Sequence, residues 1–309
     1  MDPSYLGIEI GGTKLQVVVG NREAVIQDRR RASVDPSKGG AGIRDQIQRL
    51  LAELIGKWNP RALGVGFGGP VDWRTGRICV SHHVEGWSDF ELAAWLHALT
   101  GKPACIDNDA NVAALGEARC GAGAGCNPVF YVTLGSGVGG GLVVDSRIYH
   151  GATPGESEIG HVRLERDGTI VEARCSGWAV DGKIRKLRAT GSPSLLGRLA
   201  GDEPGGEARH LPQALRENDP AAWRILNTTV QDLAFGLSHV VHLLHPQVIV
   251  LGGGLSLVGE PLRNAVAETL PGFLMEAFRP GPEIRLAALG EDAVPVGCLI
   301  LAREQGPPA

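Results

Sequence analysis

The chain has 309 residues, of which 43% are hydrophobic, and a formal net charge of −4 at pH 7. This length allows two domains, or one large domain, with an ordinary hydrophobic core. The weak negative charge and the lack of long runs of like charge exclude a nucleic-acid groove or a polybasic membrane patch. Any phosphate site must therefore be local.

The 45 glycines exceed the usual share of about 7% without a three-residue period, which indicates turns and not collagen. The six cysteines form no CxxC pair and no spacing typical of a disulfide framework, so they are interpreted as buried free thiols. The N-terminus lacks the features of a signal peptide, and no stretch of about 18 apolar residues occurs. We therefore expect a cytoplasmic protein without membrane contact.

Two segments share one construction, in which a glycine cluster separates two apolar runs. The first extends from Tyr5 to Val19 and the second from Val129 to Val144. Alternating and β-branched residues predict two strands joined by a tight turn, with glycine supplying positive φ angles. The bare amides of such a tip form a concave anion site that phosphate oxygens can approach. Two tips indicate two lobes that hold one polyphosphate.

Between the two hairpins, strands and helices alternate, which is the α/β pattern. The expected elements, in order, are a helix over 43–55, a strand over 63–67, a helix over 89–99, a short strand over 104–106 and a helix over 110–119. The first of these strands ends at Gly68-Gly69-Pro70, and the second leads into Asp107-Asn108-Asp109.

The second half continues with helices and buried strands. The expected elements after the second hairpin are a peripheral excursion over 190–220, a helix over 221–244, a strand over 247–251, a short strand over 284–289 and a helix over 293–303. The strand at 247–251 stops at Gly252-Gly253-Gly254, which gives a third glycine tip. The last helix can pack back on the first lobe.

Two common phosphate motifs do not apply. Gly135, Gly137 and Gly140 fit the GxGxxG spacing, but that fingerprint must open a helix, and here a strand-like run from Leu142 follows. A Rossmann site is therefore disfavoured. No GxxxxGK[ST] sequence occurs, so a P-loop is absent as well.

Six motifs stand in a fixed order along nearly the whole chain. They are Gly7–Lys14, Gly64–Val71, Asn108–Glu117, Thr133–Gly141, Glu158–His161 and Val250–Gly254. Together they resemble the ROK family (repressors, uncharacterised frames and sugar kinases), in the sugar-kinase branch of the actin-like ATPases. The resemblance implies a two-lobed, actin-like (ribonuclease H-like) α/β fold, with a mixed sheet in each lobe and an interdomain cleft. The small lobe would comprise 1–117 with the helix 293–309, and the large lobe 118–292.

The resemblance also implies an activity, namely transfer of the γ-phosphoryl group of ATP, with Mg²⁺, to a hexose hydroxyl, and a homodimer. Such a reaction needs positioning, charge neutralisation and one acceptor for the proton of the attacking hydroxyl. Asp109 is the candidate acceptor, because it lies where a strand ends and a helix begins. Taken alone, the same position suits a helix N-cap. Asn108 offers one acceptor and two donors to sugar hydroxyls.

Glu158 and His161 are three residues apart and would share a face on a helical turn. On the residues alone they could be half of a metal site or a surface ion pair. In the ROK family the matching residues bind sugar, and the histidine also ligates a structural zinc held by a CxCGxxGC run. That run is missing here, where only Cys175 is present, so we expect no structural zinc. The predicted sugar-binding residues are Gly68, Gly69, Asn108, Glu158, His161 and Glu172, the last matching the glutamate that follows the missing run.

Glu9 stands where the family usually has an aspartate near Mg²⁺. Carboxylate and water ligands suit Mg²⁺, and contact through water can absorb the extra methylene of Glu9. On the residues alone, Lys14 could be a solvated strand residue and Gly252–Gly254 a plain turn. The residues predicted to bind the nucleotide and its phosphates are Gly11, Gly12, Thr13, Lys14, Gly135, Ser136, Gly137, Gly139, Gly252, Gly253 and Gly254.

Several alternatives remain open at this point. Glucose, with phosphorylation at the 6-OH, is the first substrate, and an N-acylhexosamine, mannose or fructose could replace it. Polyphosphate could replace ATP, and His82 or His83 could face the sugar. The family also includes sugar-sensing repressors, which carry a helix-turn-helix before the first hairpin, whereas about eight residues precede Glu9 here. A regulator that acts through protein contacts is the alternative from another class.

Overall fold

The computed structural model of the protein describes residues 3–12, 14–80, 85–153, 155, 157–191, 193–201 and 204–305. The chain divides into two compact units. The first comprises 1–124, 141–157 and 291–309, and the second comprises 125–140 and 158–290. Each unit is described below by itself.

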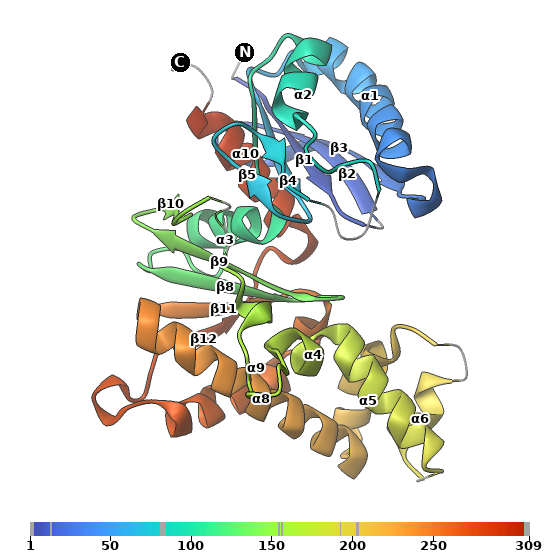
Figure 1. Ribbon diagram of the computed structural model, residues 1–309, viewed down its shortest axis with the longest axis vertical. Helices are drawn as coiled ribbons and strands as arrows, with labels where there is room; N and C mark the ends of the chain where they lie inside the picture. The colour runs from blue at the N-terminus through green and yellow to red at the C-terminus, as the bar shows by residue number, and fades with distance from the viewer. Residues whose placement is uncertain are drawn as a thin grey trace. The chain divides into compact units, whose positions relative to one another are not determined.

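The first unit is built on a five-stranded mixed sheet with the order β3-β2-β1-β4-β7 (Figure 1). Its strands are β1 (Tyr5–Ile10), β2 (Lys14–Gly20), β3 (Ile26–Ser33), β4 (Leu63–Phe67) and β7 (Ala104–Asn108). β1 is antiparallel to β2 and parallel to β4, which is parallel to β7. The short strands β5 (Val71–Asp72) and β6 (Arg77–Ile78) pair with each other.

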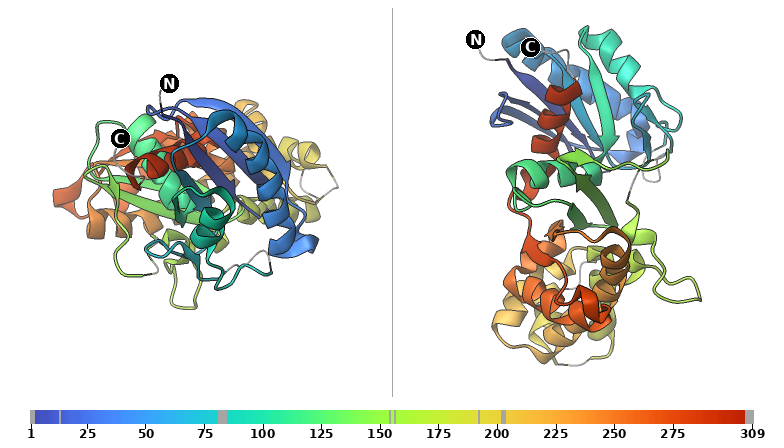
Figure 2. Two further views of the ribbon diagram at one scale, coloured as in Figure 1. Left: turned by 90° about the horizontal axis from the view of Figure 1, so that it is seen from above. Right: turned by 90° about the vertical axis from the view of Figure 1, so that its left-hand side faces the viewer.

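The strands of this sheet have two different faces because side chains alternate along them. Leu6 and Ile8 of β1 and Val65 of β4 belong to a core shared with the helices α1 (Gly39–Trp58) and α2 (Leu92–Thr100). The residues between them in sequence include glycines, and these leave room for α10 (Ala293–Gln305) on the opposite face. Figure 2 shows α10 running beside these strands.

α10 approaches the sheet and α3 (Asp109–Cys120) at backbone distance. A Cβ added at Gly64 would lie 2.0 Å from the carbonyl oxygen of Cys298, and a Cβ at Gly297 would lie 1.9 Å from that of Val112. No real Cβ fits at such distances, so only glycine allows this packing. The expectation that the last helix packs on the first lobe is confirmed.

The second sheet has the order β10-β9-β8-β11-β12. Its strands are β8 (Val129–Leu134), β9 (Val138–Val144), β10 (Arg147–Ile148), β11 (Val248–Gly252) and β12 (Glu283–Leu286). β11 is parallel to both β8 and β12, whereas β10 is antiparallel to β9. This sheet is therefore mixed as well, as predicted for each lobe.

The helices of the second unit include several that the sequence analysis did not predict. They are α4 (Val171–Cys175), α5 (Gly177–Ala189), α6 (Leu195–Ala200), α7 (Leu211–Arg216), α8 (Pro220–Leu244) and α9 (Glu260–Thr269). α8 is the long apolar helix expected over 221–244. Within the described parts of the chain, no helix combines the length and the hydropathy that crossing a membrane requires.

Two local predictions are wrong. The second helix begins at Leu92 and not at Asp89, because Asp89 has a φ of 59°, which no helix accommodates. The tip glycines Gly11, Gly135 and Gly137 do not adopt positive φ angles. Backbone hydrogen bonds close these turns. At Gly137, glycine is needed because neighbouring atoms come too close for a side chain.

The packing of α10 generates a test of stability. Gly297→Ala should destabilise the protein by about 1–3 kcal/mol, because its methyl group would overlap the carbonyl of Val112. Gly56→Ala is the matched control, since Gly56 is also helical but exposed, with nothing within 4 Å of an added Cβ. That control should stabilise by about 0.5–1 kcal/mol. Equal shifts of the two variants in thermal unfolding would contradict the close packing.

Candidate active site

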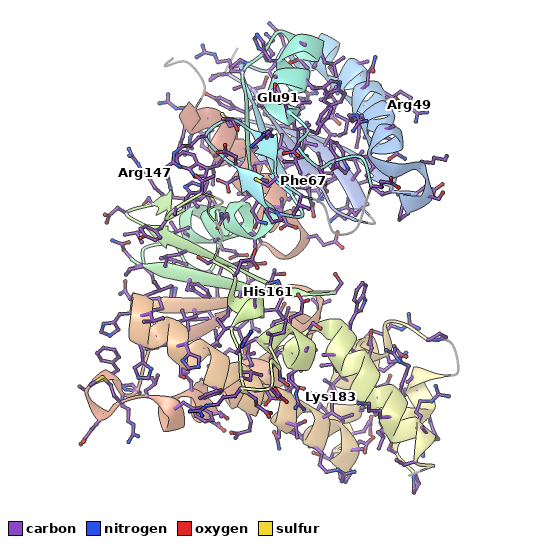
Figure 3. The ribbon with its side chains drawn as sticks, viewed as in Figure 1. Arg49, Phe67, Glu91, Arg147, His161 and Lys183 are labelled. Atoms are coloured by element: carbon purple, nitrogen blue, oxygen red, sulfur yellow. The ribbon has the colours of Figure 1, made fainter. Side chains whose placement is uncertain are left out.

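Three parallel strands of the first unit end at one edge of the sheet. The backbone N–H of Gly68, after β4, donates to the carbonyl of Ile10 at the end of β1, at 3.0 Å. A Cβ at Gly68 would lie 3.4 Å from Oδ2 of Asp109, after β7, and 3.8 Å from the Cα of Gly11. Figure 3 labels Phe67, the last residue of β4, at this edge. The first glycine tip and Asp109 are therefore neighbours.

Asn108, and not Asp109, is the N-cap of α3. Its side-chain oxygen accepts hydrogen bonds from the amides of Ala110 and Asn111 at 2.9 and 3.3 Å. The N-cap alternative for Asp109 is therefore wrong, and Asp109 is the first residue of the helix, half-buried, where a negative charge is favoured. The Asn108 amide also donates to the carbonyl of Gly69 at 3.2 Å, which leaves one of its N–H groups for a ligand.

Glu9 lies on the face of β1 that α10 covers. Its Oε2 is 3.5 Å from Nζ of Lys14 and accepts a short hydrogen bond from the Gln16 amide. Lys14 therefore forms an ion pair with Glu9. Burial raises the pKa of the Cys298 thiol, and the carboxylates of Glu9 and Asp109 raise it further.

Gln16 is a site residue that the sequence analysis missed. It is fully buried and pairs with Glu9 across the hairpin. The signal was present, because a hairpin in which Ile10 pairs with Leu15 also places Glu9 opposite Gln16. A buried glutamine in an otherwise apolar strand needs a polar partner.

In the second unit, Glu158 and His161 lie on one side of a single turn. The 3₁₀ helix η2 (Ile159–His161) follows Glu158, and its tight winding brings residues three apart together. Nε2 of His161 is 3.9 Å from Oε2 of Glu158, and their side chains are 68% and 49% exposed. Figure 3 labels His161 on this turn. Both groups are accessible to a polar ligand.

Glu172 holds the second glycine tip. Its Oε2, on α4, accepts a hydrogen bond from the amide of Val138 at 2.9 Å. A Cβ at Gly137 would lie 2.4 Å from the same oxygen, so the glycine makes this contact possible. The first residue of α5, Gly177, donates to the carbonyl of Gly135 at 2.7 Å. Two helices therefore fix the shape of this turn.

The third glycine tip lies against the second. Gly253 has a φ of 79°, and a Cβ there would lie 2.6 Å from backbone atoms of Leu134, the last residue of β8. A Cβ at Gly252 would lie 2.2 Å from the hydroxyl of Tyr131. The tip after β11 is thus packed where the second tip begins. A glycine here is required by both conformation and space.

The predicted site residues fall into two groups, one in each unit. The first unit holds Glu9, Gly11, Gly12, Lys14, Gly68, Gly69, Asn108 and Asp109. The second unit holds Gly135, Ser136, Gly137, Gly139, Glu158, His161, Glu172, Gly252, Gly253 and Gly254. Thr13, His82 and His83 lie outside the described residues.

Cys175, the one cysteine in the region where the family has its zinc-binding run, is a buried thiol. Cys175 is 0% exposed, and its Sγ lies 3.6 Å from the carbonyl of Thr229. Burial raises the pKa of this thiol to about 12. Over the described ranges of the chain, no three His, Cys, Asp or Glu side chains gather as metal ligands.

This burial predicts a selective reaction with thiol reagents. Because alkylation requires the thiolate, Cys175 and Cys298 should stay unmodified in the native protein at pH 8, whereas the exposed Cys120 should react. Mass spectrometry of peptides after iodoacetamide treatment measures this, and a denatured sample is the control. Labelling of Cys175 as fast as Cys120 would contradict its burial.

Comparisons with known proteins agree with this architecture. The family model described as the ROK family matches residues 5–305. A glucokinase of Halalkalibacterium halodurans is 30% identical over 98% of this chain and 96% of its own. A Streptomyces griseus ROK glucokinase, solved with glucose and AMPPNP, has 30% identity and a TM-score of 0.85 over 97% of this chain and 99% of its own. An N-acetylgalactosamine kinase of Shewanella is 30% identical over 92% of this chain and 96% of its own. The chain therefore belongs to the ROK family, as the motifs predicted.

Proposed function

We propose that the protein is an ATP-dependent hexose kinase, whose preferred acceptor is the 6-OH of glucose. The observation that carries this proposal is the position of Asp109 at the meeting point of three strand ends, beside Gly11 and Gly68. Support comes from the glucokinases of Halalkalibacterium halodurans and Streptomyces griseus, which resemble this chain over nearly their whole length.

In this reaction Asp109 accepts the proton of the attacking sugar hydroxyl. The hydroxyl oxygen then bonds to the γ-phosphorus, and the bond from the γ-phosphorus to the β–γ bridging oxygen breaks, so that ADP leaves. Asn108, held rigidly as the N-cap of α3, donates its remaining N–H to the sugar. Glu158, His161 and Glu172 bind further sugar hydroxyls, and Gly68 and Gly69 leave space for the ring.

Backbone groups of the three glycine tips hold the nucleotide. The first tip contacts phosphate through Gly11, Gly12, Thr13 and Lys14. The second tip supplies backbone amides for phosphate oxygens from Gly135, Ser136, Gly137 and Gly139. Gly252, Gly253 and Gly254 form the turn that faces the adenosine: Gly252 and Gly253 allow it to pack on Tyr131 and Leu134, and Gly254 has nothing within 4 Å of an added Cβ. The contact of Glu172 with Val138 links the residue proposed for sugar directly to the phosphate turn.

The donor set around Glu9 fits Mg²⁺, which binds through one or two carboxylates, waters and substrate phosphates. The Glu9 side chain is only 18% exposed, and its Oε2 lies 3.5 Å from Nζ of Lys14, so its carboxylate is held near the end of β1. Mg²⁺, when bound, neutralises the charge that spreads over the β- and γ-phosphates. Glu9 would hold it through water, and Lys14 and Gln16 orient the carboxylate.

The second candidate substrate class is an N-acylhexosamine. The Shewanella N-acetylgalactosamine kinase supports it, because its identity to this chain equals that of the glucokinases. Purified protein with ATP and Mg²⁺ should be assayed on glucose, N-acetylated hexosamines, mannose and fructose, and then with polyphosphate in place of ATP. We expect glucose with ATP to give the highest kcat/KM. The proposal includes the homodimer that the family resemblance implies.

Asp109→Asn tests the mechanism. The amide cannot accept the hydroxyl proton, so kcat should fall at least about 100-fold while glucose binding, measured by calorimetry, persists. Asp45→Asn is the matched control, because Asp45 is exposed on α1. Turnover of the Asp109 variant near the wild-type rate would exclude this residue as the base. No hexose-dependent ATP consumption by the wild type would favour the non-catalytic regulator.

Glu9→Gln tests the metal assignment. Loss of one negative charge near the phosphates should raise the Mg²⁺ concentration needed for half-maximal rate about tenfold, with partial recovery at saturating Mg²⁺. Titration of initial rates with Mg²⁺ measures this. An unchanged Mg²⁺ dependence would remove Glu9 from the metal site.

A further inference from the structure

A second set of polar side chains lies beside Asp109, in the first unit, and the mechanism above does not use it. Asp107 is 3% exposed, at the end of β7, and Asn111 is fully buried, on the first turns of α3. These two residues flank Asn108 and Asp109 in sequence. A buried carboxylate needs hydrogen-bond donors to offset the loss of water. The donors of Asp107 therefore indicate which parts of the chain it holds together.

Asp107 has three donors. Nε2 of His150 lies 2.6 Å from its Oδ2, and since a carboxylate only accepts, the ring nitrogen carries the hydrogen. Its Oδ1 accepts from the backbone N–H of Asn108 at 2.8 Å and from the side-chain amide of Asn111 at 3.1 Å. The carboxylate thus connects β7 and α3 with a loop that is distant in sequence.

A second hydrogen bond joins α3 to the loop that begins at His150. The Asn111 amide nitrogen donates to the carbonyl of Gly155 at 2.9 Å. A Cβ at Gly155 would lie 2.7 Å from the carbonyl oxygen of His150, so the two ends of the loop meet. We call Asp107, Asn111, His150 and Gly155 the Asp107 clamp.

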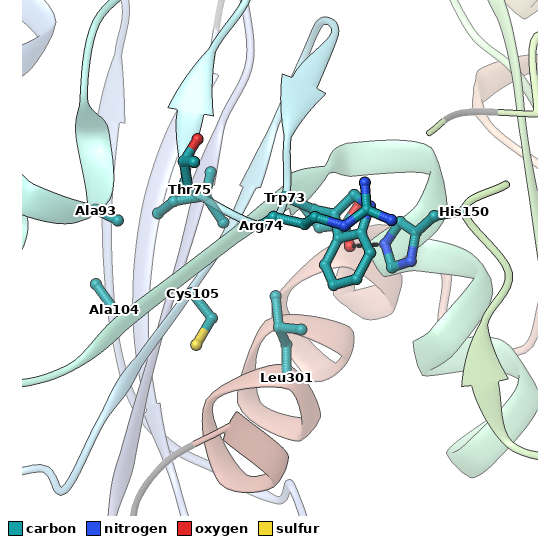
Figure 4. A pocket seen from close by; sticks show the side chains of 11 residues that line it. Trp73, Arg74, Thr75, Ala93, Ala104, Cys105, His150 and Leu301 are labelled. Atoms are coloured by element: carbon teal, nitrogen blue, oxygen red, sulfur yellow. Dashed lines mark hydrogen bonds and ion pairs between the residues drawn. The ribbon is translucent and has the colours of Figure 1, made fainter. Parts of the chain in front are cut away.

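Aromatic stacking reinforces this arrangement. The His150 ring stacks on Trp73 at 4.1 Å, with an angle of 14° between the rings, and the Arg74 guanidinium lies 4.8 Å from the Trp73 ring. Arg74 also donates a short hydrogen bond to Thr153. Figure 4 shows Trp73, Arg74 and His150 at one end of a cavity of about 120 Å³, which continues past Cys105 to Leu301.

One end of the clamp is the start of α3, where the proposed sugar ligand Asn108 and the proposed base Asp109 stand. Asp107 accepts from the backbone N–H of Asn108, and Asn111 lies on the first turn after it. We propose that Asp107, Asn111 and His150 are positioning residues for the sugar, which fix the end of β7 and the start of α3 that carry Asn108 and Asp109. This inference rests on the proposed function.

Steady-state kinetics of His150 variants test the clamp. His150→Leu keeps packing on Trp73 but loses the donor, and His150→Gln places an amide N–H near the position of Nε2. We expect the Leu variant to raise the KM for glucose about tenfold or more while the KM for ATP stays within about twofold, and the Gln variant to recover most of this loss. His97→Leu, at an exposed histidine on α2, is the control and should match the wild type.

A measurement that does not depend on catalysis accompanies the kinetics. Amide hydrogen exchange in peptides covering 147–153 should be faster in the Leu variant than in the wild type or the Gln variant. If the Leu variant does not fold, His150→Asn replaces it, because its shorter side chain cannot reach Asp107.

Three results would overturn the proposal. They are an unchanged glucose KM in the Leu variant, an equal rise in the ATP KM, and a Gln variant as impaired as the Leu variant. Unchanged exchange in the Leu variant overturns the clamp alone. A wild-type protein without hexose phosphorylation overturns the proposed function and the role of the clamp towards sugar, whatever the exchange shows.

Discussion

The contact between α10 and the glycine face of the first sheet is the constraint on which the first unit depends. Alternation along β1 and β4 puts bulky side chains towards α1 and α2, and it leaves Gly7, Gly64 and Gly66 for α10. The helix therefore reaches the backbone of the strands. Glu9 stands on this same crowded face, which explains why its carboxylate is largely buried and oriented by Gln16.

Several candidate site residues also stabilise the fold. Asn108 caps α3 with its oxygen, and Glu172 fixes the second glycine tip through Val138. Such double use limits what each side chain can offer a ligand, since an oxygen that caps a helix is already satisfied. It also places the remaining donors rigidly, which lowers the entropy that ligand binding must overcome.

Much of the fold could be predicted from the sequence, because strands with alternating or continuous apolar residues and a long apolar helix have strong periodic signals. Both hairpins, β4 and α8 lie where they were expected. The positive φ angles at the tips were wrong, since glycine also serves for close approach, and only the three-dimensional neighbour, here Glu172, distinguishes the two uses. The partnership of Asp107 with His150 has no local pattern, because 43 residues separate them.

The discontinuity of the first unit has a consequence for synthesis on the ribosome. Its sheet is formed mostly by the first 108 residues, but the helix that covers the glycine face spans Ala293–Gln305. Until that helix emerges, Gly7 and Gly64 lack the residues of α10 that pack against them. This face of the N-terminal strands therefore remains partly uncovered during translation of the second unit, and transiently exposed surface of this kind favours aggregation.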